Sequence, residues 1–73
     1  MKIQPGRTYT DRKGRRVIIV REMQTPEPHR FLGVTVEASG MESHDTWDED
    51  GRCDMNGRHS PWDITHPWVG SQA

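Results

Sequence analysis

Hydrophobic residues in this chain gather in short runs that are separated by polar turns. The run at residues 17–20, Val-Ile-Ile-Val, is β-branched, has arginines on both sides and is too short for a helix. Because the run has no polar face, it predicts a central strand over residues 15–21 that is buried on both sides.

A second group of apolar residues alternates with polar ones. Leu32, Val34 and Val36 are separated by Gly33 and Thr35. This period of two predicts a strand within residues 30–38 that has one buried face. Shorter stretches rich in β-forming residues predict two more strands, at residues 7–10 and 43–47.

The segments between these runs have the composition of turns and loops. Residues 11–14, Asp-Arg-Lys-Gly, have Asp first and Gly last, as in a type I turn or a bulged hairpin loop. Residues 48–51 form a second acidic turn that ends in Gly. Asn56-Gly57 is a strong hairpin signal, so we expect a short strand on each side of it. Two prolines within residues 24–29 predict a loop.

The C-terminal part contains the one predicted helical element. Ser60 followed by Pro61 is typical of a helix start, so we expect a single helical turn before a last short strand. Together the elements predict an all-β fold, a small antiparallel SH3-like barrel of about five short strands. We expect the barrel to span residues 1–66 and a flexible tail to follow at residues 67–73.

A chain of 73 residues has room for one thin core. We expect Trp47 and Trp62 to anchor it, with Ile18 and Val20 partly covered on the second face of their strand. Val34→Asp should unfold the domain because it places an unpaired charge in the core. The predicted buried positions are Tyr9, Val17, Ile19, Leu32, Val34, Val36, Trp47 and Ile64.

Charge is unevenly distributed along the chain, although the net charge is only -1. Residues 1–36 carry eight Lys and Arg against three acids, and residues 37–73 carry two Arg against eight acids, so the halves are +5 and -6. Such asymmetry can mark a basic face that binds nucleic acid. A compact fold can also interleave the two halves and cancel the field.

Cysteine use and hydropathy bear on the cellular compartment. A single cysteine, Cys53, excludes an internal disulfide and fits a reducing cytosol. No apolar run approaches the roughly 20 residues needed to span a bilayer, and the start of the chain lacks the apolar stretch of a signal peptide. We therefore expect a cytoplasmic protein with no membrane partner.

Two groups of residues resemble metal sites only in part. Cys53, His44, His59 and His66 are metal-ligating types, but none of them forms the close ligand pair of a structural zinc site. The turn at residues 48–51 resembles part of a calcium loop, but it lacks the first ligand and the closing bidentate Glu. The sequence therefore predicts no metal and no cofactor.

Ser43, His44 and Asp45 are the residue types of a hydrolytic triad. Neighbours on a strand point to opposite faces, so adjacent residues do not converge as a triad requires. A domain this thin also has little room for a pocket that excludes water. The sequence predicts no catalytic residues and no enzyme activity.

Two features are candidate binding sites. Arg12, Lys13, Arg15 and Arg16 cluster at the first hairpin, where flexible cations could contact phosphates and an adjacent exposed aromatic would add base stacking. The alternative is a solvated turn. Trp68 precedes a polar tail, so it is either an exposed contact for a protein partner or a ring folded over one end of the barrel.

Several turn and aromatic positions also form a pattern along the chain. They are Pro5-Gly6-x-x-Tyr9, Arg12-x-Gly14-Arg15, Trp47-x-x-Asp50-Gly51-Arg52 and Ser60-Pro61-Trp62-Asp63-Ile64. In this order they resemble a family of small tailed-bacteriophage and prophage proteins. The resemblance covers nearly the whole chain up to Ile64 and implies a phage or prophage origin and a small β fold. The family has an aromatic residue soon after the Asp-Gly-Arg turn, where this chain has Cys53 and Met55. The resemblance implies no activity and no functional residue.

These observations lead to three functional hypotheses. The first is a non-catalytic accessory module that binds a host or phage protein. The second is a small barrel that binds nucleic acid through the hairpin at residues 12–16, and the third is a minor structural component of the virion. We expect a monomer in the cytoplasm of a bacterial host.

Overall fold

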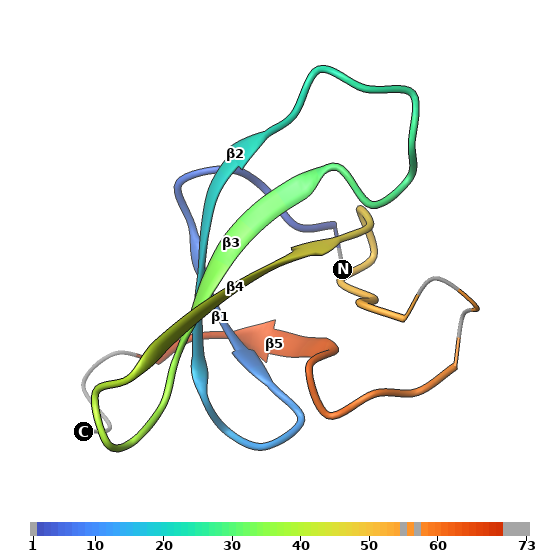
Figure 1. The fold of residues 1–73 in the computed structure, drawn as a ribbon. Helices are drawn as coiled ribbons and strands as arrows, with labels where there is room; N and C mark the ends of the chain where they lie inside the picture. The colour runs from blue at the N-terminus through green and yellow to red at the C-terminus, as the bar shows by residue number, and fades with distance from the viewer. Residues whose placement is uncertain (1, 55, 57, 70–73) are drawn as a thin grey trace.

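The computed structural model describes residues 2–54, 56 and 58–69. Five antiparallel strands form one sheet (Figure 1): β1 (Thr8–Asp11), β2 (Arg16–Glu22), β3 (Phe31–Val36), β4 (Glu42–Trp47) and β5 (Ile64–Pro67). Their order is β4-β3-β2-β1-β5, so β4 and β5 form the two edges of the sheet. The expected all-β, five-stranded fold is confirmed. It is consistent with an SH3-like barrel, although β4 and β5 do not pair and the barrel stays open.

Two turns of the same kind, each with the sequence Asp-x-x-Gly-Arg, shape the chain. In the first, Gly14 N–H donates to the Asp11 carbonyl at 3.0 Å, and the amides two and four residues after Asp11 donate to its Oδ1 at 2.9 Å. In the second, Asp48 Oδ1 accepts the two equivalent amides at 2.9 Å. The glycines have φ of 79° and 85°, the left-handed region that favours glycine. Both turns predicted from the sequence are confirmed.

The segment at residues 60–63 is a β-turn, so the prediction of a helical turn is wrong. Asp63 N–H donates to the Ser60 carbonyl at 3.1 Å, and no described residue is helical. The Asp63 carboxylate accepts the amides of Ser60 and Cys53, both at 3.0 Å. These two bonds join both arms of the β4–β5 loop, and the chain continues from Ile64 as strand β5.

The expected hairpin at Asn56-Gly57 includes a residue outside the described part of the chain. The described residues on either side of it, 52–54 and 58–60, are not in strands. Among the residues that the structure describes, no helix has the length and hydrophobicity to cross a membrane.

The core lies inside the curl of the sheet, and Trp47 is its largest fully buried side chain. The ring packs against Gly33, where an added Cβ would lie 2.9 Å from Trp47 Cζ3 and 2.8 Å from the Ile18 carbonyl oxygen. A side chain at Gly33 would therefore displace the ring. The buried hydrophobic residues are Ile3, Tyr9, Val17, Ile19, Phe31, Trp47 and Ile64.

The predicted inward face of β3 is wrong. Phe31, Gly33 and Thr35 are buried, whereas Leu32, Val34 and Val36 are half-buried on the opposite face. Alternation with a period of two does not by itself say which set points inward. The Trp47 ring favours the observed face, because it leaves no room for a Cβ at Gly33, which lies between Phe31 and Thr35 on the inner face of β3. The other five predicted core positions, Tyr9, Val17, Ile19, Trp47 and Ile64, are confirmed.

The expectations for Ile18 and Val20 on the outer face of β2, and for Trp62 as a core anchor, are confirmed only in part. Ile18 is half-buried, as expected, but Val20 is 54% exposed, so β2 is buried on one face only. Trp62 is 43% exposed and is not a core anchor. The backbone carbonyl of Trp62, rather than its ring, contacts the core, because this carbonyl accepts a hydrogen bond from the indole N–H of Trp47 at 2.7 Å.

The last strand ends next to residue 66, the expected end of the barrel. Strand β5 includes Pro67, and the amide of Trp68 donates to the Thr8 carbonyl at 3.1 Å. Residues 70–73 of the expected tail lie outside the described residues.

Two substitutions on β3 test which face points inward. Thr35→Asp should abolish folding, because Thr35 is 1% exposed and the carboxylate would have no partner there. Val34→Asp should cost only about 1 kcal/mol, roughly the full range of strand propensities, because its side chain lies on the outer face. Thermal unfolding followed by circular dichroism distinguishes the two. A folded Thr35→Asp together with an unfolded Val34→Asp would contradict the observed register.

Candidate functional site

The four cations of the first hairpin do not form one continuous basic surface. Arg15 is held inside a network, with Nε 2.7 Å from Asp11 Oδ2 and Nη1 2.8 Å from Glu37 Oε1. Its side chain is only 11% exposed and stacks over the Trp62 ring, 5.7 Å from the centroid. Arg15 therefore ties the hairpin to the β3–β4 turn and to the loop before β5.

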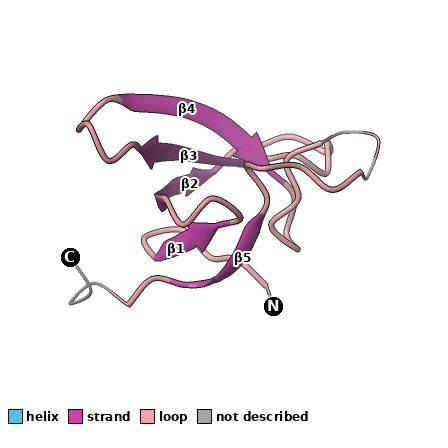
Figure 2. Cartoon of the chain, turned by 90° about the horizontal axis from the view of Figure 1, so that it is seen from below, coloured by secondary structure: helices cyan, strands magenta, loops and turns pink. Residues whose placement is uncertain are grey.

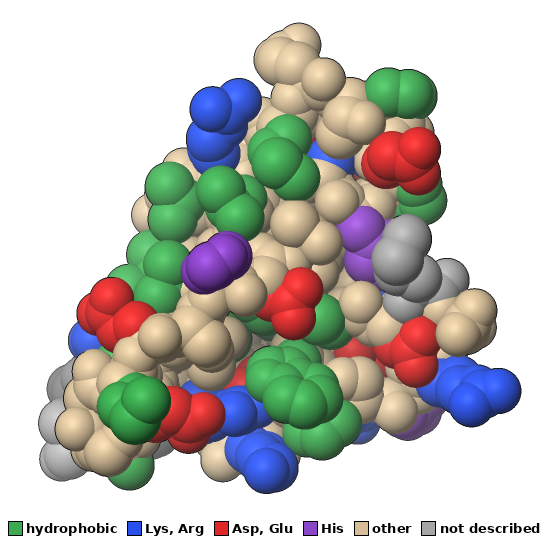
Figure 3. Space-filling model, in the orientation of Figure 1, with side chains coloured by type: hydrophobic (Ala, Val, Ile, Leu, Met, Phe, Trp, Pro, Cys, Tyr) green, Lys and Arg blue, Asp and Glu red, His purple; other side chains and the backbone are tan. Residues whose placement is uncertain are grey.

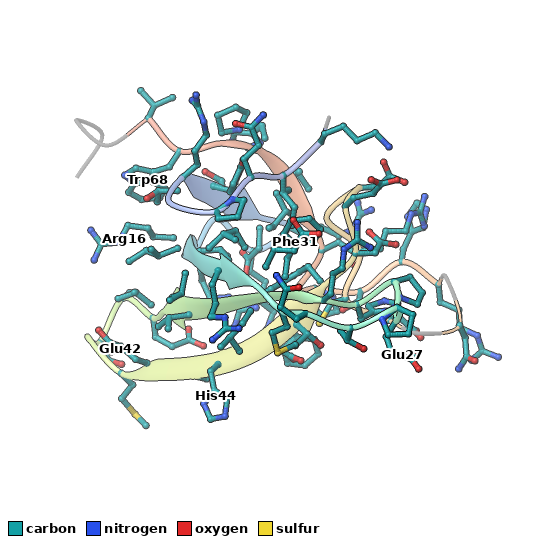
Figure 4. All side chains as sticks on the ribbon, turned by 90° about the horizontal axis from the view of Figure 1, so that it is seen from above. Arg16, Glu27, Phe31, Glu42, His44 and Trp68 are labelled. Carbon is teal, nitrogen blue, oxygen red and sulfur yellow. The ribbon has the colours of Figure 1, made fainter. Side chains whose placement is uncertain are left out.

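The other three hairpin cations differ in their surroundings. Arg12 Nε lies 3.5 Å from the buried carboxylate of Asp63. Lys13 and Arg16 are exposed and make no ion pair with any described residue. Arg16 is outside the hairpin turn, on the outer face of β2, and its side chain extends away from the molecule (Figure 4). Two of the four predicted phosphate contacts are thus engaged with carboxylates.

Other ion pairs join the basic and acidic halves of the chain. Lys2 Nζ lies 3.0 Å from Glu49 and 3.3 Å from Asp50, and Arg15 reaches Glu37 from the second half. Folding therefore brings some cations of residues 1–36 next to carboxylates of residues 37–73, which cancels part of the charge asymmetry seen in the sequence. Carboxylates on β4 are left outside these pairs.

Trp68 is half-buried, between the two alternatives that the sequence left open. Its ring lines an open hollow of about 520 Å³ together with Lys2, Gln4, Arg7 and Tyr9. Tyr9 itself is fixed there, because its hydroxyl accepts the Gln4 amide at 2.9 Å. Trp68 thus covers part of the β1 end of the barrel and keeps one part of its surface open to solvent.

The residue types of a metal site or triad do not converge. In the described ranges, His, Cys, Asp and Glu side chains form no group of three that could hold a metal ion. His44 lies on the outer face of β4, whereas the alternation of the strand places Ser43 and Asp45 on the other face. Burial, followed by a hydrogen bond with Asp45, raises the pKa of the Cys53 thiol to about 12. The thiol is therefore protonated at neutral pH and is a poor nucleophile.

The surface that sequence reasoning missed is the outer face of the sheet. Its aliphatic side chains, which we name the outer apolar face, are Ile18, Val20, Leu32, Val34 and Val36. Cross-strand pairing places Val34 between Ile18 and His44, so the face is continuous across β2, β3 and β4. Figure 3 shows hydrophobic side chains gathered along the left flank, over β2 and β3. Val20 is exposed on this face, and the other four side chains are half-buried.

A hollow of about 560 Å³ adjoins this face at Leu32, under the β2–β3 loop. Met23, Arg21 and His29 also line it. Both ring nitrogens of His29 are buried without a hydrogen-bond partner in the described residues, an arrangement that costs stability and is uncommon in native proteins. The outer apolar face thus continues into a recess large enough for one partner side chain.

The sequence did contain a signal for this surface. Residues 17–20 and the alternating residues of β3 supply more aliphatic side chains than a thin core can hold, so some must lie outside it.

Comparison of the chain with protein-family models, with curated proteins and with solved structures finds no match.

Paired substitutions test whether Arg15 is a structural residue. Arg15→Gln removes the charged hydrogen bond to the buried Asp11 carboxylate and should lower the free energy of unfolding by about 1.5–3 kcal/mol. Lys13→Gln, on the same hairpin, should change it by less than about 0.5 kcal/mol. Urea unfolding measures both. Equal, small effects would show that Arg15 contributes no more to folding than a solvated cation does.

Proposed function

We propose that this chain is a non-catalytic protein-binding module whose docking surface is the outer apolar face. The observation that supports this most is a continuous row of aliphatic side chains on one face of the sheet, of which Val20 is 54% exposed and the other four are half-buried. Small soluble domains seldom leave such a face uncovered unless a partner binds there. The adjoining recess at Leu32 and His29 offers a place for an anchoring side chain.

The flanks of the face support a protein partner over a nucleic acid. Arg16 and Glu42 lie on either side of Val36 in one cross-strand row, so the rim carries both signs of charge. Mixed polar rims around an apolar centre are typical of protein interfaces. Phosphate binding needs several unpaired cations on one surface, but Arg12 and Arg15 are paired with carboxylates.

The hypothesis of a phage accessory protein acting in the cytoplasm of a bacterial host rests on the sequence resemblance. Under this hypothesis, the expected partner is a host or phage protein. A binding role is also compatible with the described residues, in which His, Cys, Asp and Glu side chains form no group of three that could hold a metal ion.

Two valines of equal exposure provide a matched test of this function. Val20 on the outer apolar face is 54% exposed, and Val69 near the C-terminus is 53% exposed. Val20→Glu should weaken binding of the partner at least about tenfold, or about 1.4 kcal/mol, because it places a charge in the interface. Val69→Glu should bind as the unchanged chain does. The measurement is quantitative capture from nuclease-treated bacterial lysate, with circular dichroism to confirm folding.

Equal recovery of proteins by the two variants would contradict the proposed docking surface. Loss of the captured material on nuclease treatment would instead identify a nucleic acid as the partner and would overturn the protein-binding function.

A further inference from the structure

Strand β4 has one side without a partner. It is an edge of the sheet and has six residues, and its far side pairs with no strand in the described ranges (Figure 2). An unpaired strand edge presents a row of backbone N–H and C=O groups that an extended peptide can satisfy by adding another strand.

The hydrogen bonds of the β3–β4 hairpin show which amides point outward. Glu37 N–H donates to the Met41 carbonyl at 2.8 Å, which makes this pair a hydrogen-bonded one. Antiparallel pairs alternate between bonded and non-bonded, and the register continues as Val36 with Glu42 and Val34 with His44. The backbone groups of Glu42 and His44 therefore point away from β3, toward the free edge.

The next outward amide along β4 is already occupied. By the same alternation Thr46 N–H points to the free edge, where it donates to Asp45 Oδ1 at 2.8 Å. The uncapped part of the edge is therefore the N-terminal half of β4, centred on Glu42 and His44. This half is also the part next to the outer apolar face, because Val36 and Val34 are the cross-strand neighbours of these residues.

The charge of this edge indicates the chemistry of a strand that pairs with it. Glu42 and Asp45 are both exposed, and neither makes an ion pair with a described residue. Since they are three positions apart, Glu42 faces the outer side of the sheet and Asp45 the inner side. A second copy of this chain would bring two acidic edges together, so repulsion disfavours pairing of β4 with itself.

We propose that a basic, extended segment of a partner protein adds to the free edge of β4 as a sixth strand. Its backbone would bond the outward groups of Glu42 and His44, and its Lys or Arg side chains would lie beside Glu42 and Asp45. This inference rests on the proposed function and names the partner segment of that docking surface. The added strand would also widen the outer apolar face beyond β4.

The test uses two capped octapeptides as probes. The basic one is Thr-Lys-Val-Lys-Lys-Val-Lys-Thr, and the acidic one has glutamate at every lysine position. Titration followed by amide chemical shifts should show the basic peptide shifting and protecting the amides of Glu42 and His44, with the acidic peptide having no effect. Glu42→Lys should reduce the preference for the basic peptide at least about tenfold, because it reverses one of the two charges.

A backbone variant separates strand addition from simple charge attraction. His44→Pro removes one outward N–H and leaves the bonds to β3 intact, and proline is tolerated at this kind of edge position. It should weaken binding of the basic peptide at least about tenfold. His44→Val, which keeps the amide and is a good strand former, should bind the basic peptide at least about tenfold more tightly than His44→Pro does. The amide spectra of both variants confirm that they are folded.

The outcomes distinguish this inference from the proposed function. Equal binding of the basic peptide by His44→Pro and His44→Val, equal affinity for the two peptides, or no shift at Glu42 and His44 would overturn strand addition. If His44→Pro still captures the protein partner from lysate while Val20→Glu loses it, the docking function stands and strand addition is wrong. If Val20→Glu keeps the partner, the docking function itself fails.

Discussion

The packing of Trp47 against Gly33 is the contact on which the rest of the structure depends. The indole is the largest fully buried side chain inside the sheet, and no Cβ fits between the ring and the β3 backbone. Its N–H reaches across to the Trp62 carbonyl at 2.7 Å. One side chain therefore joins the β3–β4 hairpin to the loop that leads into β5. Removing a buried ring of this size typically costs about 3–5 kcal/mol, a large fraction of the stability of a small domain.

The same contact explains how the chain acquires a binding surface. Because the Trp47 ring leaves no room for a Cβ at Gly33, β3 turns Gly33 inward together with Phe31 and Thr35. Its aliphatic residues are then forced outward, where they join Ile18 and Val20 of β2. A constraint inside the core thus produces the apolar surface outside it. The open barrel adds a second consequence, because among the described strands β4 has no neighbour on its far side, which leaves part of its backbone available to a partner strand.

Much of the fold follows from local sequence, because turn chemistry is local. The Asp-x-x-Gly-Arg turns and the loop with two prolines place strands β1 to β4 within one or two residues of their observed ends. The inward face of β3 could not be predicted in this way. The choice between the two sets of alternating residues depends on the contact of Gly33 with Trp47, a residue of the next strand. The exposure of Trp62 and the burial of Arg15 likewise depend on contacts between distant segments, Arg15 with Glu37 and Trp47 with Trp62.

The candidate site was less predictable than the fold. Clustered cations in the sequence gave no sign that Asp11 and Asp63 would pair with two of them. The free edge of β4 depends on the strand order, which no single segment encodes.

Hydrogen exchange of the indole protons is the most direct test of the central contact. The Trp47 indole N–H should exchange only through global unfolding, as slowly as the slowest amides of β2 and β3, because it is buried and bonded to the Trp62 carbonyl. The exposed Trp62 should exchange far faster. A Trp47 indole that exchanges as fast as that of Trp62 in the folded protein would contradict the packing of Trp47 at the centre of this fold.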